Sequence, residues 1–532
     1  MMDNSTRTYQ TRLSLNPIAL EAFHACAELF AHIEHCLLAD ISKGKSTGEL
    51  KSPYLVKYGI TARQFNALRV KVEGKIASIK ELRKMQISDL KEHIKVLETK
   101  IVQLQKKPLL SLLVHQKKRR LHKLQQRMDQ LVKEQSQDKI SLCFGSKKLF
   151  HAQFNLEENN YTTHEEWLES WRHARTSEIF FLGSKDETSG NQTCTACIEE
   201  DDRLTLRIRL PNALHAKFGK YLTIPPITFS YGHQEILTSL KDCKQRQLLI
   251  GNKDPNYINH GQALTFRFKH DKKGWRLFLS TALPKPQWKT SQDKGVIGID
   301  INTDHLALVE TDRFGNPLYK KTIPLNLYGR SKEQSLALIG DACSQVVSHA
   351  EKTLKPLILE DLDFQKKKQS LRETCSASQS RKLSSFSYQA ILTHLKSRAF
   401  GKKIEVKQVN PAFTSLIGRV KFATRYGLSI HHAAALCIGR RFLNLSEKVP
   451  RHLNKIPDGK DSHVALSLPV RNRGKHVWNQ WRDVSKKVSA ALVAHFRAKR
   501  SSSTLKAAPE TETFPDFVDA TPTCESLAAL LG

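Results

Sequence analysis

The chain has 532 residues, of which 39% are hydrophobic, and it contains 23 Phe, 11 Tyr and 6 Trp. This composition excludes a wholly disordered protein, and the length predicts about two to four domains. The net charge is +33, from 85 Lys and Arg against 52 Asp and Glu. Such a surface favours a nucleic-acid partner, because phosphates that meet it release counterions; a basic soluble surface or a membrane-surface binder is the alternative.

The cysteines and the apolar runs indicate the compartment. Ten Cys without a framework are typical of a reducing cytoplasm. Cys194 and Cys197 lack a second pair at zinc-finger spacing, and we interpret both as ordinary thiols. No apolar leader or run of ~20 apolar residues is present. We expect a cytoplasmic, prokaryotic, nucleoid-associated protein that has no membrane partner.

The first part of the chain is predicted to be mainly helical. Alternation over 8–13 predicts an edge strand, and apolar spacing predicts a helix over 17–42. Two apolar seams with steps of three and four lie on either side of Pro108 and predict an antiparallel helical hairpin within 60–134. The seams are Ile87, Leu90, Ile94, Leu97, Ile101 and Leu104, then Leu121, Leu124, Met128 and Leu131. Basic residues near the predicted tip favour nucleic-acid contact, although a solvated coiled coil explains the seams equally well; these residues are Lys106, Lys107, Lys117, Lys118, Arg119 and Arg120.

From 142 to 283 the apolar period changes to two, which predicts strands. Over 203–210 the Leu and Ile side chains should face inward and Arg207 and Arg209 outward. The segment 264–280 predicts a hairpin. A small β-barrel or sandwich with a basic face fits this pattern, and Arg207 and Arg209 are candidate phosphate contacts; a merely soluble surface is the alternative.

The segment from 295 to 444 carries the candidate chemistry. Its apolar runs and turns predict the order βββαβαβ followed by a further helix. The predicted strands are 295–302, 305–311, 318–323, 356–363 and 403–409, and the helices are 332–352, 386–400 and 430–444. Beyond it, 501–532 contains five acids and one Lys506 among Ser, Thr, Pro and Ala, which predicts a disordered tail.

Two carboxylates stand out on these strands. Asp300 lies within the first strand and Glu360 near the end of a later one. Hydrolysis of a phosphodiester by two metal ions needs carboxylates that converge from different strands, and oxygen ligands indicate Mg²⁺ or Mn²⁺. The alternative is that both acids merely cap strands, although a buried strand is a costly place for an unpaired Asp.

Short motifs in this region resemble those of TnpB-type (OrfB) proteins of insertion sequences, which are related to the type V CRISPR effectors. The segment 298–302 (GIDIN) resembles the first RuvC motif, and 357–362 (LILEDL) resembles the second. The segment 409–415 (VNPAFTS) is similar to the approach to the third motif, which is expected at 431–438. The strand pair 266–275 is also similar. Within the family the chain resembles the TnpB-related accessory proteins.

The resemblance implies a multidomain α/β protein with a C-terminal RNase H-like (RuvC) domain, a β-barrel wedge domain and an N-terminal helical hairpin. It implies a transposon-associated, RNA-guided DNA-binding protein and Mg²⁺-dependent DNA endonuclease, with DNA and a transposon-derived guide RNA as partners and Asp300 and Glu360 as metal ligands. The expected domains are 1–58 (N-terminal segment with the start of the wedge), 59–140 (hairpin), 141–290 (wedge), 291–500 (nuclease) and 501–532 (tail).

Two departures from the family pattern concern the third motif. No CxxC follows Thr414 and Ser415, so zinc is not expected. His431, with His432 beside it, holds the position of the third Asp. Imidazole can act as a base but does not replace an anionic bridge between Mg²⁺ ions.

Three interpretations of this helix remain open. In one, His431 or His432 is a catalytic base, and Asp361 or Asp363 supplies the missing charge. In another, the chain is a nuclease-dead, repressor-like protein that binds DNA under RNA guidance. In the third, 430–444 is only a packing helix. A transposase accessory factor is a weaker alternative for the whole chain.

Basic residues around this region are candidate nucleic-acid contacts, although each one alone is as easily explained as a solvated charge. They are Lys366, Lys367, Lys368, Arg419, Lys421, Arg425, Arg440 and Arg441.

Overall fold

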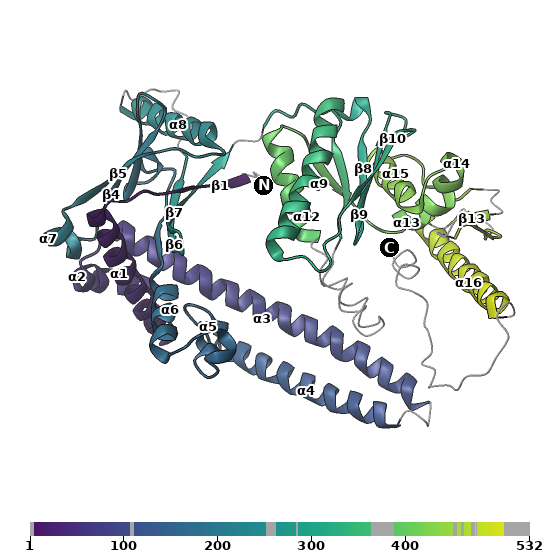
Figure 1. Cartoon of the computed structure of the whole chain (residues 1–532), viewed down its shortest axis with the longest axis horizontal. Coiled ribbons are helices and arrows are strands. Elements are labelled where there is room, and N and C mark those ends of the chain that lie inside the picture. The colour runs from purple at the N-terminus through teal and green to yellow at the C-terminus, as the bar shows by residue number, and fades with distance from the viewer. Residues whose placement is uncertain are drawn as a thin grey trace. The chain divides into compact units, whose positions relative to one another are not determined.

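The computed structural model describes residues 5–106, 111–251, 262–283, 286–362, 388–450, 455–458, 462–469, 474 and 476–504. The chain divides into two compact units, Met1–Lys285 and Pro286–Gly532 (Figure 1). Within the described residues, no helix is both long enough and apolar enough to cross a bilayer.

The first unit combines long helices with two small sheets. Its helices are α1 (Pro17–Ser42), α2 (Thr47–Tyr58), α3 (Ala62–Gln105), α4 (Ser111–Ser136), α5 (Lys147–Ala152), α6 (His164–Thr176), α7 (His215–Phe218) and α8 (His233–Gly251). Its strands are β1 (Ser5–Arg12), β2 (Glu178–Phe181), β3 (Cys194–Ile198), β4 (Leu204–Arg209), β5 (Tyr221–Ile227), β6 (Leu264–Asp271) and β7 (Gly274–Leu283). Short 3₁₀ turns are η2 (Glu157–Asn159), η3 (Thr188–Gly190) and η4 (Asn212–Leu214).

Side-chain caps define where the long helices begin. The Asn16 side chain accepts a hydrogen bond from the Ala19 N–H, and Pro17 starts α1 with its φ already helical. Thr61 and Gln64 form a reciprocal capping box at the start of α3. These caps stabilise the helix ends that the apolar periodicity alone does not define.

The predicted helical hairpin is present as α3 and α4, which lie side by side (Figure 1). Lys80 pairs with Asp138 and Arg83 with Glu134, so the early part of α3 contacts the end of α4 and the helices are antiparallel. Four residues of the α3 seam are buried, namely Ile87, Ile94, Leu97 and Ile101, whereas no described side chain of α4 is fully buried. The hairpin therefore presents a largely polar surface to solvent.

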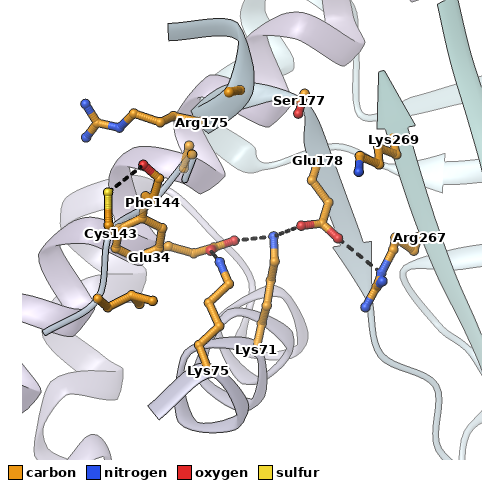
Figure 2. Close-up of a pocket in the computed structure, with 14 residues that line it drawn as sticks. Glu34, Lys71, Lys75, Cys143, Phe144, Arg175, Ser177, Glu178, Arg267 and Lys269 are labelled. Carbon is orange, nitrogen blue, oxygen red and sulfur yellow. Dashed lines mark hydrogen bonds and ion pairs between the residues drawn. The ribbon is translucent and has the colours of Figure 1, made fainter. Parts of the chain in front are cut away.

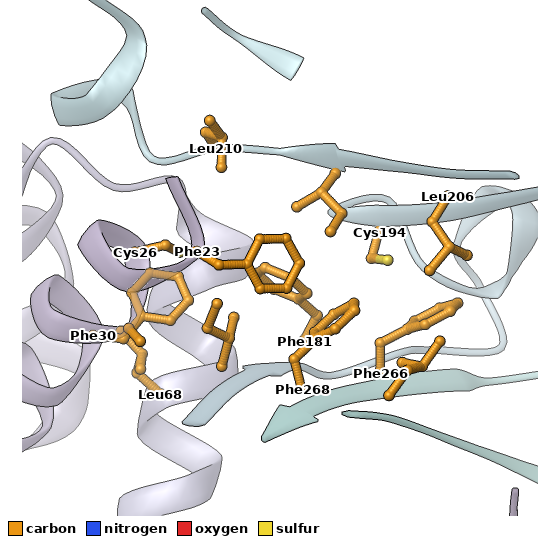
Figure 3. Close-up of a cluster of buried hydrophobic side chains, with 14 of the residues drawn as sticks. Phe23, Cys26, Phe30, Leu68, Phe181, Cys194, Leu206, Leu210, Phe266 and Phe268 are labelled. Carbon is orange, nitrogen blue, oxygen red and sulfur yellow. The ribbon is translucent and has the colours of Figure 1, made fainter. Parts of the chain in front are cut away.

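The described strands of the first unit form two open sheets, in the orders β1-β7-β6-β2 and β3-β4-β5. The expected closed β-barrel is therefore wrong for this part of the chain. The reason is that α1 covers the apolar face of the four-stranded sheet: the Phe23 ring centroid is 5.2 Å from that of Phe268 and 5.1 Å from that of Trp275 (Figure 3). The three-stranded sheet contributes Leu204, Leu206 and Ile208 to the same core, so α1 and this second sheet together cover the four-stranded sheet.

Individual strand predictions in this unit are confirmed. β1 is an edge strand that pairs antiparallel with β7. Asp271 pairs with Gly274, so β6 and β7 form the predicted hairpin. In and beside β4 the alternation of buried and exposed residues is as expected, with the inward set Leu204, Leu206, Ile208 and Leu210 all buried.

The second unit is built on a five-stranded sheet in the order β10-β9-β8-β11-β12. Its strands are β8 (Ile297–Ile301), β9 (His305–Thr311), β10 (Pro317–Pro324), β11 (Leu357–Glu360) and β12 (Val406–Val409), and β13 (Lys455–Pro457) pairs with β14 (His463–Ala465). Its helices are the 3₁₀ turn η5 (Gln292–Lys294), α9 (Lys332–Thr353), α12 (Tyr388–Gly401), α13 (Thr414–Ile417), the π-helix η6 (Gly418–Ala423), α14 (Thr424–Tyr426), α15 (Ile430–Phe442) and α16 (Val477–Thr504).

The predicted order βββαβαβα is confirmed in this unit. β8, β9 and β10 are antiparallel neighbours, and β8, β11 and β12 run parallel. Ile297 and Ile299 pack with α9 and α12 on one face, while Val296 and Ile358 pack with Ile438 of α15 on the other. Because side chains alternate along a strand, this pattern places Asp300 and Glu360 on the α15 face.

The predicted start of the disordered tail at residue 501 is wrong. α16 continues through Thr504, so residues 501–504 are helical. The remainder of the predicted tail lies outside the described residues.

Candidate functional site

The candidate site lies where α15 crosses the five-stranded sheet. Small residues allow this helix to approach the strand backbone: a Cβ at Gly298 would lie 1.9 Å from the Ala435 carbonyl oxygen. At Gly418 a Cβ would meet the backbone of Ala433 at 2.6 Å. A larger side chain at either glycine would push α15 away, so these contacts determine how near His431 comes to β8.

The strand register brings the two predicted carboxylates to the same level. Leu357 pairs with Ile297 and Ile358 with Gly298 in parallel register. Asp300 lies three residues after Ile297, and Glu360 lies three residues after Leu357. The two acids therefore lie at the same level on neighbouring strands, on one face of the sheet. Asp300 is buried, at 8% exposure, whereas Glu360 is half-buried. The sequence motifs alone predicted this placement.

Asp300 is held by two donors on one oxygen. Asn302 Nδ2 donates to Asp300 Oδ2 at 3.0 Å, and His431 Nδ1 lies 3.3 Å from the same oxygen. An ionised carboxylate only accepts, so this contact requires a hydrogen on Nδ1 of His431; in a neutral imidazole Nε2 is then an acceptor. The His431 side chain is 47% exposed, so solvent reaches the ring that carries Nε2.

A second histidine lies against the first. The ring centroids of His305 and His431 are 4.7 Å apart in an edge-to-face arrangement. His305 Nδ1 lies 2.7 Å from Asp304 Oδ1, and its Nε2 lies 3.4 Å from Asn302 Nδ2. Sequence reasoning missed Asn302 as a functional neighbour, although it ends the GIDIN motif.

Glu360 has different partners. The Thr414 hydroxyl donates to Glu360 Oε1, and the Tyr388 hydroxyl donates to the Glu360 carbonyl oxygen at 2.5 Å. Thr414 is fully buried at the start of α13, within the segment that leads to the third motif. Its position in that segment could have indicated a role for Thr414 at the site, but none was predicted from the sequence.

His432 faces away from the carboxylates. Its Nδ1 lies 2.8 Å from Ser429 Oγ, and its Nε2 lies 3.2 Å from Thr322 Oγ1 on β10. Burial lowers the pKa of His432, an interaction with the Lys321 backbone opposes that shift, and the charge of Lys320 adds to it. Nδ1 therefore contacts the cap of α15 and Nε2 contacts β10, so both ring nitrogens are engaged, which disfavours the expected role of His432 as a catalytic base.

Of the remaining predicted acids, the structure describes only Asp361, which has a partner elsewhere. Gln408 Nε2 of β12 donates to Asp361 Oδ1 at 3.2 Å, which turns that carboxylate along the sheet. Asp363 lies outside the described residues, as do Lys366, Lys367 and Lys368. The expectation that Asp361 supplies the missing charge is therefore not supported by its contacts.

These residues do not fit the expected pair of Mg²⁺ or Mn²⁺ ions. Among the described residues, no group of three or more His, Cys, Asp and Glu side chains is arranged to hold a metal ion. Asp300 and Glu360 supply two carboxylates, and His431 supplies a neutral nitrogen where hard divalent cations need an anionic oxygen. Within the part of the chain that the structure describes, the donor set is therefore one acid short.

Several predicted nucleic-acid contacts have structural roles instead. Arg419 is buried, at 5% exposure; burial lowers its pKa, and the charge of Asp458 opposes the shift. Arg440 Nη1 donates to the Gly315 carbonyl oxygen at 2.6 Å, and Arg441 Nε pairs with Glu447 at 2.5 Å. These contacts favour fold stabilisation over phosphate binding for all three arginines.

Other predicted contacts are more accessible. Arg425 is exposed beside Tyr426, whereas Lys421 Nζ donates to the Ser446 carbonyl oxygen at 2.6 Å. In the first unit Arg207 is exposed and lies 3.8 Å from the Tyr221 ring centroid, and Arg209 is half-buried. On α4, Lys117 is half-buried and the others are exposed, namely Lys118, Arg119 and Arg120.

No protein-family model and no curated protein matches this chain. Among solved structures, the chain is similar to a Cas12f1–sgRNA–target DNA complex, with 11% identity and a TM-score of 0.20 over 68% of this chain and 95% of that chain. It is also similar to a CRISPR-Cas12f ternary complex, with 12% identity and a TM-score of 0.18 over 82% of this chain and 98% of that chain. TM-scores this low do not establish a shared fold.

Proposed function

We propose that this chain is an RNA-guided DNA-binding protein whose C-terminal unit is an RNase H-like (RuvC) domain that retains binding and has lost most cleavage. The sheet order β10-β9-β8-β11-β12, with Asp300 and Glu360 on adjacent parallel strands, supports the domain assignment. The resemblance to TnpB-type proteins, and to their accessory-protein subgroup, supports the guide RNA and the transposon association.

One observation carries the loss of cleavage. His431 Nδ1 lies 3.3 Å from Asp300 Oδ2, at the position where the resemblance expects a third acid. Two-metal hydrolysis needs that acid to offset the charge of the cations, and an imidazole cannot do so. Binding a polyanion needs only positive charge, and the chain carries +33.

The proposal is tested by purifying the full chain from its native host and sequencing the RNA that accompanies it. We expect one predominant RNA species, protected in proportion to the protein. A preparation free of RNA, or one that carries only bulk cellular RNA, would contradict the guided part of the proposal.

A second candidate function is a Mg²⁺- or Mn²⁺-dependent DNA endonuclease with a rearranged site. The acceptor nitrogen Nε2 of His431, oriented by Asp300, favours it because such an imidazole can act as a general base. The test is DNA cleavage by the RNA-bound chain with each metal. Cleavage that is lost in Asp300→Asn and Glu360→Gln but kept in Asp341→Asn, an exposed acid on α9, would establish this candidate.

A further inference from the structure

A charged cavity lies within the first unit, between α1, α3, the end of α6 and the sheet strands β2 and β6 (Figure 2). Its volume is about 340 Å³. The charged residues that line it are Glu34, Lys71, Lys75, Arg175, Glu178, Arg267 and Lys269. None of the sequence motifs pointed to it, because its residues come from segments far apart in the chain.

Its two acids are held in an alternating row of ion pairs, which Figure 2 shows. Lys71 Nζ lies between Glu34 Oε1, at 2.6 Å, and Glu178 Oε2, at 3.0 Å. Lys75 Nζ closes one end on Glu34 at 2.7 Å, and Arg267 Nε closes the other end on Glu178 at 3.1 Å. Two carboxylates are therefore shared by three cations.

The cations of the cavity exceed its acids. Five of its lining residues are Lys or Arg and two are Glu, so the excess is three positive charges. Lys269 adds its charge from the exposed face of β6, opposite Glu178 in the strand register. Burial alone would raise the pKa of Glu178, but the charges of Lys71, Arg267 and Lys75 together lower it. The surplus of cations thus dominates the local field.

The charge of Arg175 is held by neutral partners. Arg175 Nη2 lies 2.6 Å from His35 Nδ1, and its guanidinium lies 5.5 Å from the Trp171 ring centroid. Burial, and then the charge of Arg175, lower the pKa of His35 to about 4, so this imidazole is neutral at neutral pH. The positive charge is therefore fixed in place without being cancelled.

The rim next to Arg175 is built for close packing. Gly145 has φ +100°, and a Cβ there would lie 2.8 Å from the Trp171 ring. Only glycine tolerates both the backbone conformation and the contact. The segment that carries Cys143 and Phe144 is thereby held against α6, which gives the cavity a defined wall.

We propose that this cavity binds a phosphate group of a nucleic-acid backbone, with Arg267, Lys269 and Lys75 as its contacts. Guanidinium and ammonium groups are the donors that phosphates prefer, and a cationic surplus around a partly enclosed space attracts anions to it. The choice of a nucleic acid over a free anion rests on the proposed function. The site is separate from the carboxylates of the second unit.

The experiment measures binding of fluorescein-labelled single-stranded RNA and double-stranded DNA to the full chain over a range of salt concentrations. Arg267→Gln combined with Lys269→Gln should weaken binding about tenfold, the value of one charged hydrogen bond, and flatten the salt dependence. The matched control is Lys272→Gln combined with Lys273→Gln, which removes the same charge from the exposed β6–β7 turn. The control should lose much less affinity.

A variant of opposite sign guards against misfolding as an explanation. Glu178→Gln removes a carboxylate from the cavity and should tighten binding about threefold, because a nearby like charge is lost. Damage to the fold would weaken binding instead. Tightening therefore supports the proposal even if the double variant proves unstable.

The outcomes separate the cavity from the proposed function. Equal losses in the double variant and its control, or no tightening in Glu178→Gln, would overturn the cavity proposal and leave RNA guidance standing. Effects confined to RNA, or confined to DNA, support the proposal and identify the ligand. Inorganic phosphate is added as a competitor of the labelled nucleic acids. If the variants change only the effect of this competitor and not the binding of nucleic acid, the site takes a small anion and the proposal fails. A wild-type chain that binds neither nucleic acid overturns both proposals.

Discussion

The carboxylate pair of the second unit and the cavity of the first unit each contain two acids, but the partners of these acids differ in charge. Asp300 and Glu360 are held by an amide, an imidazole and a hydroxyl. Glu34 and Glu178 are held by lysines and an arginine. The comparison teaches that the charge of the surrounding residues, more than the presence of acids, decides whether a site favours an anion.

The largest expected effect tests how α15 is held on the carboxylate face. Gly298→Ala should destabilise the second unit by about 3 kcal/mol, because the new methyl group would overlap the Ala435 carbonyl oxygen. Urea unfolding of the full chain measures the change. Gly401→Ala is the matched control, since a Cβ there meets nothing within 4 Å. Equal stability of the two variants would contradict the close packing of α15 on β8.

The next effect tests whether the missing third acid explains the proposed loss of DNA cleavage. His431→Asp restores a carboxylate beside Asp300 and should raise Mg²⁺-dependent DNA cleavage at least roughly 100-fold, the upper range for a single supporting group at a metal site. His432→Asp should give no gain, because that position faces Thr322 on β10. A wild-type chain that already cleaves as fast as His431→Asp would show that the site is intact.

Much of the second unit was predictable from the sequence because its signals are local. The element order follows from apolar runs and turns, and the motifs around Asp300 and Glu360 predicted that the two acids lie on neighbouring strands. The partners of the site were harder to predict, because Thr414 and His431 reach the strands only through packing of α13 and α15. Whether Arg419 is exposed or buried also depends on tertiary structure and not on the local pattern.

The first unit was less predictable from the sequence, because more of it depends on tertiary packing. The alternation in β4 and β6 indicated inward faces, but it did not show that α1 would cover the sheet with Phe23 and Phe30. The cavity unites charged side chains of α1, α3, α6, β2 and β6, and in the sequence none of them differs from an ordinary solvated charge. Only the fold reveals that they share one space.

A smaller effect concerns pH and the cavity wall. The folded-state pKa of His35 is about 4, below its ordinary value of 6.5, chiefly because of burial. Between those values the unfolded chain takes up a proton that the folded chain does not, so the free energy of unfolding falls as the pH falls. His35→Gln should reduce that fall by up to about 1 kcal/mol after solvent screening.

The measurement is urea unfolding of both proteins at several pH values between 8 and about 4, over the window in which His35 changes its charge. Above pH 7 the two stability curves should run parallel. Curves that stay parallel down to pH 4 would show that His35 is not held neutral beside Arg175.

The central claim is guided binding without a need for metal. The most direct measurement is binding of the RNA-associated chain, in EDTA, to DNA that matches its co-purified RNA and to DNA of scrambled sequence. We expect tight binding to the matched DNA, much weaker binding to the scrambled DNA, and a loss of the difference after ribonuclease treatment. Equal binding to both DNAs, or a strict requirement for Mg²⁺, would contradict it.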